Sequence, residues 1–160
     1  MFVIVHSGQT GVERGAHRAA VNAGLPIDGF MPFDKRDELG PIPADVAQAL
    51  KPYAERGPRP AVRANVNLAS GVMLVVPDAK KPEKFTAMSA VLQSIRTARV
   101  HSLICDSTTN LEDVARWARH LAEITDPTRI VVTGPRETRW PEGLIVARRL
   151  VAALAHATDS

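Results

Sequence analysis

What this sequence lacks excludes several classes of protein. Its one cysteine, Cys105, excludes an internal disulfide and is typical of a reducing compartment. Aromatic residues make up only 4% of the chain, and no block of lysines or arginines accompanies the net charge of +3. Stacking platforms and a basic stripe for nucleic acid are therefore missing. No apolar run approaches the roughly 18 residues that span a bilayer. We expect a cytoplasmic protein that binds neither nucleic acid nor a membrane.

The composition that remains is that of an ordinary globular protein. Of the 160 residues, 45% are hydrophobic and 23% are charged, which is enough to build a real core. The first residues lack the basic stretch and the cleavage site of a secretion leader, and they are interpreted as a strand. No repeat, low-complexity segment or linker is visible. We expect a single domain over residues 1–160.

Continuous apolar runs of strand length alternate with helical patterns. The runs cover residues 2–5, 71–76, 101–105 and 129–133, with a weaker one at 27–31. Helical spacing predicts helices near residues 12–23, 87–95, 111–122 and 144–154, and shorter ones near 44–50 and 62–68. Continuous apolar strands are typical of parallel sheets that are covered on both faces. The pattern predicts an α/β, Rossmann-like three-layer fold with a mostly parallel central sheet flanked by helices.

Small and polar residues follow each of the four strong strands. In an open parallel sheet, ligands bind outside the carboxyl ends of the strands. The segments that follow the strands are residues 6–11, 77–81, 106–110 and 133–138. We therefore expect a binding site along this rim.

The first of these segments predicts an anion site. It contains Ser7, Gly8, Gln9, Thr10 and Gly11. The two glycines allow a tight turn and a close approach to a ligand, and the next helix offers free N–H groups at its positive end. The alternative is a tight strand-to-helix turn capped by Thr10. The pattern is neither a GxGxxG fingerprint nor a P-loop, which disfavours NAD-dependent hydride transfer and NTP hydrolysis.

Charged residues near this turn and near the last strand are further candidates. Arg14 and Arg136 could each clamp a phosphate with a guanidinium group, and Gly134 opens the exit loop of the last strand. Glu13 could hold a ribose hydroxyl or favour the helix dipole. The basic pair at 35–36 could arch over the site. The alternative for the arginines and the basic pair is a solvated surface position.

Other reactive residues give weaker signals. His6 ends a strand and is either an acid–base group or a hydrogen-bonded structural histidine. Cys105 lies in an apolar strand and is expected to be an inert core residue. Asp106 beside Ser107 could suggest a hydrolytic triad, but the sequence has no GxSxG elbow. The remaining histidines lack metal-ligand spacing, so we predict no protein-ligated metal.

Several segments together resemble one known family. Residues 7–16, 29–32 with 40–43, 63–66, and 133–137 with 140–141 are similar, in this order, to the motifs of the molybdenum carrier proteins. That family belongs to the SLOG superfamily and is related to the LONELY GUY-type phosphoribohydrolases. The resemblance implies a Rossmann-like fold, a bound phosphorylated pterin (the molybdenum cofactor) or nucleotide, and frequent assembly as a homo-oligomer.

The chain departs from the family pattern in two places. Ser7 stands where the first loop of the family usually has a glycine. The family also has a Gly-Thr turn after the middle strand, whereas this chain has the lysine-rich segment 80–84 there. The Gly-rich turn with a catalytic glutamate that marks the phosphoribohydrolases is not visible.

Two main hypotheses follow. The first is a non-catalytic carrier of a phosphorylated pterin or nucleotide, held by helix N-terminal amides, Arg14 and Arg136. The second is an enzyme that hydrolyses the glycosidic bond of a nucleoside monophosphate, with Glu13 or Asp106 activating water. A regulatory nucleotide sensor is disfavoured because the short chain carries no effector domain.

Overall fold

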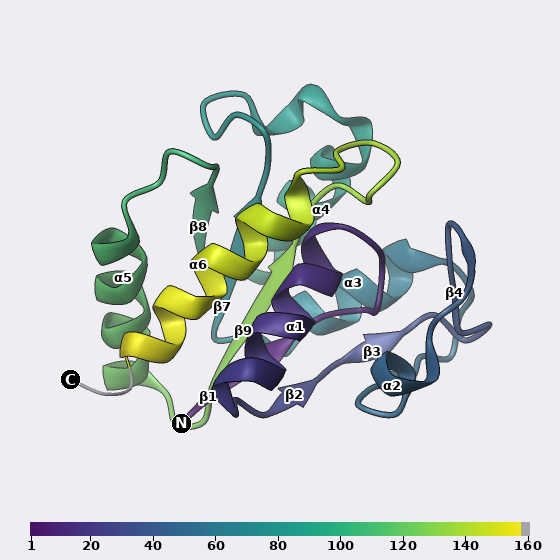
Figure 1. The fold of residues 1–160 in the computed structure, drawn as a ribbon, viewed down its shortest axis with the longest axis horizontal. Helices are drawn as coiled ribbons and strands as arrows, with labels where there is room; N and C mark the ends of the chain where they lie inside the picture. Colours follow the sequence, from purple (N-terminus) through teal and green to yellow (C-terminus); the bar gives the residue numbers. More distant parts are fainter. Residues whose placement is uncertain (158–160) are drawn as a thin grey trace.

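A five-stranded parallel sheet forms the centre of this computed structural model, which describes residues 1–157 (Figure 1). Its strand order is β2-β1-β9-β7-β8, and every neighbouring pair is parallel. The strands are β1 (Phe2–Val5), β2 (Ile27–Asp28), β7 (Gly71–Val75), β8 (His101–Cys105) and β9 (Thr128–Thr133). The predicted Rossmann-like sheet is confirmed. Because β9 lies between β1 and β7, the loops that leave β1 and β9 are neighbours.

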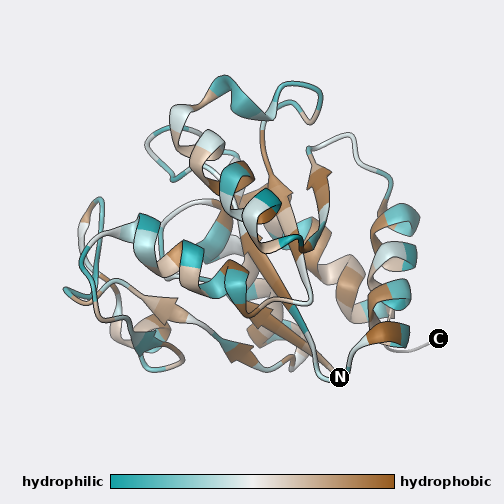
Figure 2. Cartoon of the chain, turned by 180° about the vertical axis from the view of Figure 1, so that it is seen from behind, coloured by the Kyte–Doolittle hydropathy of each residue, from teal (hydrophilic) through white to brown (hydrophobic). Residues whose placement is uncertain are grey.

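Helices cover both faces of the sheet. One face carries α1 (Val12–Ala23), α5 (Leu111–Ile124) and α6 (Gly143–Ala157), and the other carries α3 (Pro58–Asn67) and α4 (Thr86–Ala98). Ile4 of β1 packs in the first of the two resulting cores, whereas Val5 packs in the second. Figure 2 shows the long strands of the central sheet largely in the hydrophobic colour. Their continuous apolar sequence follows from burial on both sides.

The weak run at 27–31 is divided between two sheets. β2 ends at Asp28, and β3 (Phe30–Met31) pairs with β6 (Lys51–Pro52) outside the central sheet. Gly29 causes the change of direction, because its φ is +136° and a Cβ there would lie 2.1 Å from the His6 carbonyl oxygen. Only glycine tolerates that combination.

A small lateral unit lies beside the sheet (Figure 1). It contains a hairpin of β4 (Arg36–Asp37) and β5 (Gly40–Pro41), the short helix α2 (Ala44–Ala47), and its own core of Met31, Ile42, Val46 and Leu50. A 3₁₀ turn, η1 (Pro82–Lys84), precedes α4. Helix α3 begins earlier than predicted because Pro58 occupies its first turn, where a missing N–H has no cost.

No helix within residues 1–157 has both the length and the apolar character that crossing a bilayer requires.

Gly15 of α1 sets the spacing between α1 and α6. A Cβ at Gly15 would lie 2.2 Å from the Leu144 carbonyl oxygen. We expect Gly15→Ala to lower the free energy of unfolding by about 2 kcal/mol in urea titrations, because overpacking outweighs the better helix propensity of alanine. Gly24→Ala is the matched control, since a Cβ there meets nothing within 4 Å. Its only cost is the left-handed backbone, about 1 kcal/mol. A stabilised Gly15→Ala protein would contradict the close packing of the two helices.

Candidate functional site

The glycine turn that follows β1 and the loop that leaves β9 touch one another. A Cβ at Gly11 would lie 2.8 Å from both the Glu137 nitrogen and the Pro135 carbonyl oxygen. The Glu137 N–H also donates to Thr10 Oγ1 at 3.0 Å. The structure thus brings together the two segments that the sequence singled out at the carboxyl edge of the sheet.

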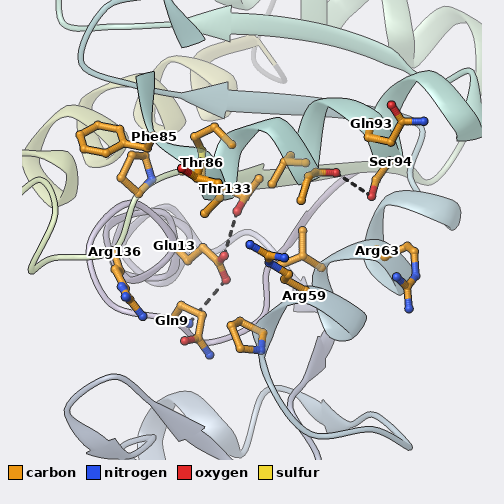
Figure 3. A pocket seen from close by; sticks show the side chains of 18 of the residues that line it. Gln9, Glu13, Arg59, Arg63, Phe85, Thr86, Gln93, Ser94, Thr133 and Arg136 are labelled. Atoms are coloured by element: carbon orange, nitrogen blue, oxygen red, sulfur yellow. Dashed lines mark hydrogen bonds between the residues drawn. The ribbon is translucent and has the colours of Figure 1, made fainter. Parts of the chain in front are cut away.

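The glycine turn folds around the carboxylate of Glu13, which is only 3% exposed. The N–H and the hydroxyl of Ser7 both donate to Glu13 Oε1 at 2.6 Å, and the N–H of Gln9 donates to the same oxygen at 3.5 Å. The hydroxyl of Thr133 at the end of β9 donates to Oε2 at 2.9 Å (Figure 3). A side chain of the protein itself therefore occupies amides that were expected to face a bound anion.

The environment of Glu13 acts on its acidity in two directions. Burial raises the pKa of the Glu13 carboxyl above its ordinary value, and the hydrogen bonds from Ser7, Thr133 and Gln9 oppose that rise. The N–H groups of Ser7 and Gln9 can only donate, so Glu13 Oε1 acts as an acceptor in both of these bonds.

Two adjacent carboxylates of the β4–β5 hairpin pair with the two predicted phosphate-binding arginines. Arg14 donates to Asp37 and to the Gly8 carbonyl oxygen, both at 2.9 Å. Arg136 Nε lies 3.1 Å from Glu38, which also accepts hydrogen bonds from the hydroxyls of Thr10 and Thr138. The hairpin is thereby fastened to both loops.

A cavity of about 770 Å³ opens beside this contact, between α3, α4 and the exit loop of β9. Glu13 and Thr133 are its most buried polar lining residues, each 3% exposed. Figure 3 shows Glu13 pointing into a space that Gln9, Arg59 and Arg136 surround. Cationic side chains line the outer part of the cavity: Arg59, Arg63, Lys84, Arg136 and Arg139.

Only part of the predicted site lines this cavity. Gln9, Gly134 and Arg136 do. The other predicted residues do not line it. Arg14 is held in its ion pair with Asp37, and the rest are buried in the glycine turn: Ser7, Gly8, Thr10 and Gly11. Sequence reasoning missed Arg59 and Arg63 of α3. Their i,i+4 spacing, which places both on one face of a helix, was the available signal.

His6 has a structural role. Its Nδ1 accepts a hydrogen bond from the Gly8 N–H at 2.9 Å, so the ring proton lies on Nε2, 3.0 Å from His17 Nδ1. Burial, followed by the nearby His17 and Arg14, lowers the pKa of His6 to about 3. The ring is therefore neutral in the folded protein, as the structural alternative for this residue predicted.

The other weak candidates lie outside the cavity lining. Asp106 accepts hydrogen bonds from the Ala79 N–H at 2.8 Å and from the Thr108 hydroxyl at 2.6 Å, which joins the exit loops of β7 and β8. These bonds, that of Thr108 foremost, lower the pKa of Asp106.

Burial raises the pKa of Cys105 to about 12, so its thiol is unreactive at neutral pH. Within residues 1–157, no group of three His, Cys, Asp or Glu residues is placed to hold a metal ion.

The model of the circularly permutated YpsA SLOG family matches residues 4–155. The chain belongs to this family. Its fold is also similar to that of a solved structure from Syntrophus aciditrophicus SB, described as "Putative molybdenum carrier protein", with a TM-score of 0.81 and 19% sequence identity. That match covers 95% of this chain and 93% of the other. A comparison with curated proteins gives no match. These findings confirm the predicted family resemblance of this SLOG protein.

The neutral His6 predicts a dependence of stability on pH. The unfolded chain takes up a proton at this residue below the ordinary histidine pKa of 6.5, whereas folded His6 takes one up only near 3. The stability that His6 contributes is thus fully present above 6.5 and falls as the pH drops toward 3, with a slope near 1.4 kcal/mol per pH unit. Urea titrations at several pH values between 3 and 6.5 give the free energy of unfolding as a function of pH. Its slope should be smaller in His6→Gln than in the wild type. His101→Gln, at an exposed site on β8, is the control; an unchanged slope in His6→Gln would contradict the assignment.

We expect the stability of the β4–β5 hairpin to depend on the contacts of Glu38. Because its carboxylate joins the hairpin to Thr10, Arg136 and Thr138, Glu38→Gln should destabilise the protein by about 1–3 kcal/mol and speed hydrogen exchange over residues 35–42. Exchange measured by mass spectrometry checks this. The exposed Glu55→Gln should leave exchange unchanged. Equal exchange in the wild-type and Glu38→Gln proteins would show that the carboxylate does not fasten the hairpin.

Proposed function

We propose that this SLOG protein is a carrier-like binding protein that holds a phosphorylated pterin or nucleotide in the cavity between α3, α4 and the exit loop of β9. One observation carries the proposal. Arginines from two separate elements, Arg59 and Arg63 of α3 and Arg136 and Arg139 of the exit loop, line the same cavity. Arginine forks match phosphate oxygens in geometry and charge.

The size and walls of the cavity suit a small aromatic molecule. Its volume of about 770 Å³ lies within the range of small-molecule sites. Apolar side chains of α3, α4 and the segment before α4 form part of the lining: Val62, Phe85, Met88 and Val91. A planar ring can pack against these walls while its phosphate remains at the cationic opening.

The molybdenum cofactor is one such ligand, and the description of the similar solved structure supports it. The cationic rim and the apolar walls fit the phosphorylated organic part of that cofactor. The described residues offer no ligand set for the metal itself. The protein would therefore hold the group by its phosphate and its ring system, and the bound cofactor would supply the metal chemistry to whichever enzyme receives it. Assembly as a homo-oligomer in the cytoplasm belongs to the same proposal.

One observation favours the hydrolytic alternative. Glu13 is a buried carboxylate with a raised pKa that lines the cavity, and such groups serve as general acids or bases. Asp106 lacks this support, because its pKa is lowered and it does not line the cavity.

Removing the α3 cations tests the binding proposal. In isothermal titration with a nucleoside monophosphate such as GMP, the double variant Arg59→Ala/Arg63→Ala should bind at least about tenfold more weakly than the wild type. Arg116→Ala on α5 is the matched control, since this arginine is paired with Asp113 away from the cavity. Equal affinity of the wild type and the double variant would rule out phosphate binding at this cavity.

Incubation with the same nucleotides distinguishes a carrier from a hydrolytic enzyme. Incubated protein should leave them intact when the products are separated by liquid chromatography. Release of free base by the wild type, and its loss in Glu13→Gln, would replace the carrier proposal with the enzymatic one.

A further inference from the structure

Glu13 is the single acidic residue among the described residues that line the cavity, whose other charged lining residues are cationic. The inference below rests on the proposed function and concerns what Glu13 does to the ligand. Glu13 is 3% exposed, whereas Arg59, Arg63 and Arg136 are solvent-exposed. The cavity therefore has an acidic group at its inner end and cations at its opening.

The two oxygens of Glu13 are unequally used. Oε1 accepts from the Ser7 N–H, the Ser7 hydroxyl and the Gln9 N–H, and these bonds saturate it. Oε2 accepts one bond, from the Thr133 hydroxyl. Since a carboxylate oxygen accepts at least two hydrogen bonds, Oε2 keeps one acceptor position at the inner end of the cavity.

The acceptor position that remains on this buried carboxylate determines which chemical group of a ligand can lie next to it. A second anion is repelled, a neutral acceptor leaves the carboxylate unsatisfied, and an N–H or O–H donor offsets its desolvation. A ligand thus enters with its donor edge first and leaves its phosphate at the arginines of the opening. In a nucleotide or a phosphorylated pterin, the part that leads in this orientation is the ring.

We propose that Glu13 is a specificity-determining residue that binds the exocyclic 2-amino group of a 2-amino-4-oxopyrimidine ring. Guanine nucleotides and phosphorylated pterins share this amine, which projects beyond the ring edge and so reaches the one acceptor position at the inner end of the cavity. Hypoxanthine lacks the amine, and adenine carries its amine at another ring position. The cavity accordingly holds guanine-like or pterin-like rings in preference to other purines.

Glu13→Gln separates this role from a structural one. The three donors of the glycine turn hold the remaining amide oxygen at the Oε1 position, which places the NH₂ group at the Oε2 position. There the Thr133 hydroxyl turns to accept from it. The variant keeps the volume and the internal bonds of the wild type but presents a donor to the cavity in place of an acceptor.

The experiment is isothermal titration of wild-type and Glu13→Gln proteins with GMP and IMP, which differ only in the 2-amino group. The wild type should bind GMP about tenfold or more tightly than IMP, the effect of a hydrogen bond to a charged acceptor. In Glu13→Gln the ratio should fall to about one while the affinity for IMP is retained. Neopterin monophosphate, titrated beside GMP, shows which ring system carries the shared 2-amino group into the cavity: tighter binding of either one than of IMP supports the proposal.

Other outcomes overturn the proposal in distinguishable ways. Equal wild-type affinity for GMP and IMP, with both lost in Arg59→Ala/Arg63→Ala, rejects ring reading by Glu13 and leaves phosphate binding intact. A weaker 2′-deoxy-GMP with equal GMP and IMP shows that the ribose is read instead. A preference for GMP that survives in Glu13→Gln rejects the role of the carboxylate, and an equal loss of all probes in that variant shows a purely structural role. Failure of every probe to bind the wild type rejects this inference together with the proposed function.

Discussion

The buried carboxylate of Glu13 is the constraint on which the arrangement of the site depends. Its hydrogen bonds from Ser7, Gln9 and Thr133 join the turn after β1 to the end of β9. A buried carboxyl is tolerated only when hydrogen-bonding groups surround it, so the turn takes its shape from an internal carboxyl group. In many nucleotide-binding folds a ligand phosphate fills such a turn. Here the carboxyl of Glu13 fills the turn, so the proposed function places the phosphate at the cations of the cavity opening.

The hairpin of β4 and β5 supplies protein carboxylates to the two arginines that were expected to bind phosphate. Asp37 neutralises Arg14, whose side chain is 13% exposed, and Glu38 pairs with Arg136, whose side chain is 48% exposed. The buried pair is part of the scaffold. Arg136, by contrast, also lines the cavity. In the proposed function a ligand anion would share this exposed guanidinium with Glu38, and the cations of α3 would carry most of the attraction for phosphate.

The sequence sufficed to predict the sheet and the rim, because continuous apolar strands and helical spacing are local patterns with one structural solution. It also identified Gln9, Gly134 and Arg136 as residues of the rim, and these line the cavity. It did not reveal that Asp37 pairs with Arg14, since that contact joins residues 23 apart through a hairpin whose position depends on tertiary packing. The cations of α3 were missed because they lie in a loop-rich stretch of weak periodicity. Glu13 was named as a candidate, but only its burial shows that it fills the glycine turn.

A crystal structure of the protein with a bound nucleoside monophosphate would locate the phosphate. We expect density for it beside Arg59, Arg63 and Arg136, with the amides of Ser7 and Gln9 still donating to the Glu13 carboxylate. A phosphate bound by those amides, with the Glu13 side chain displaced from the turn, would contradict this expectation.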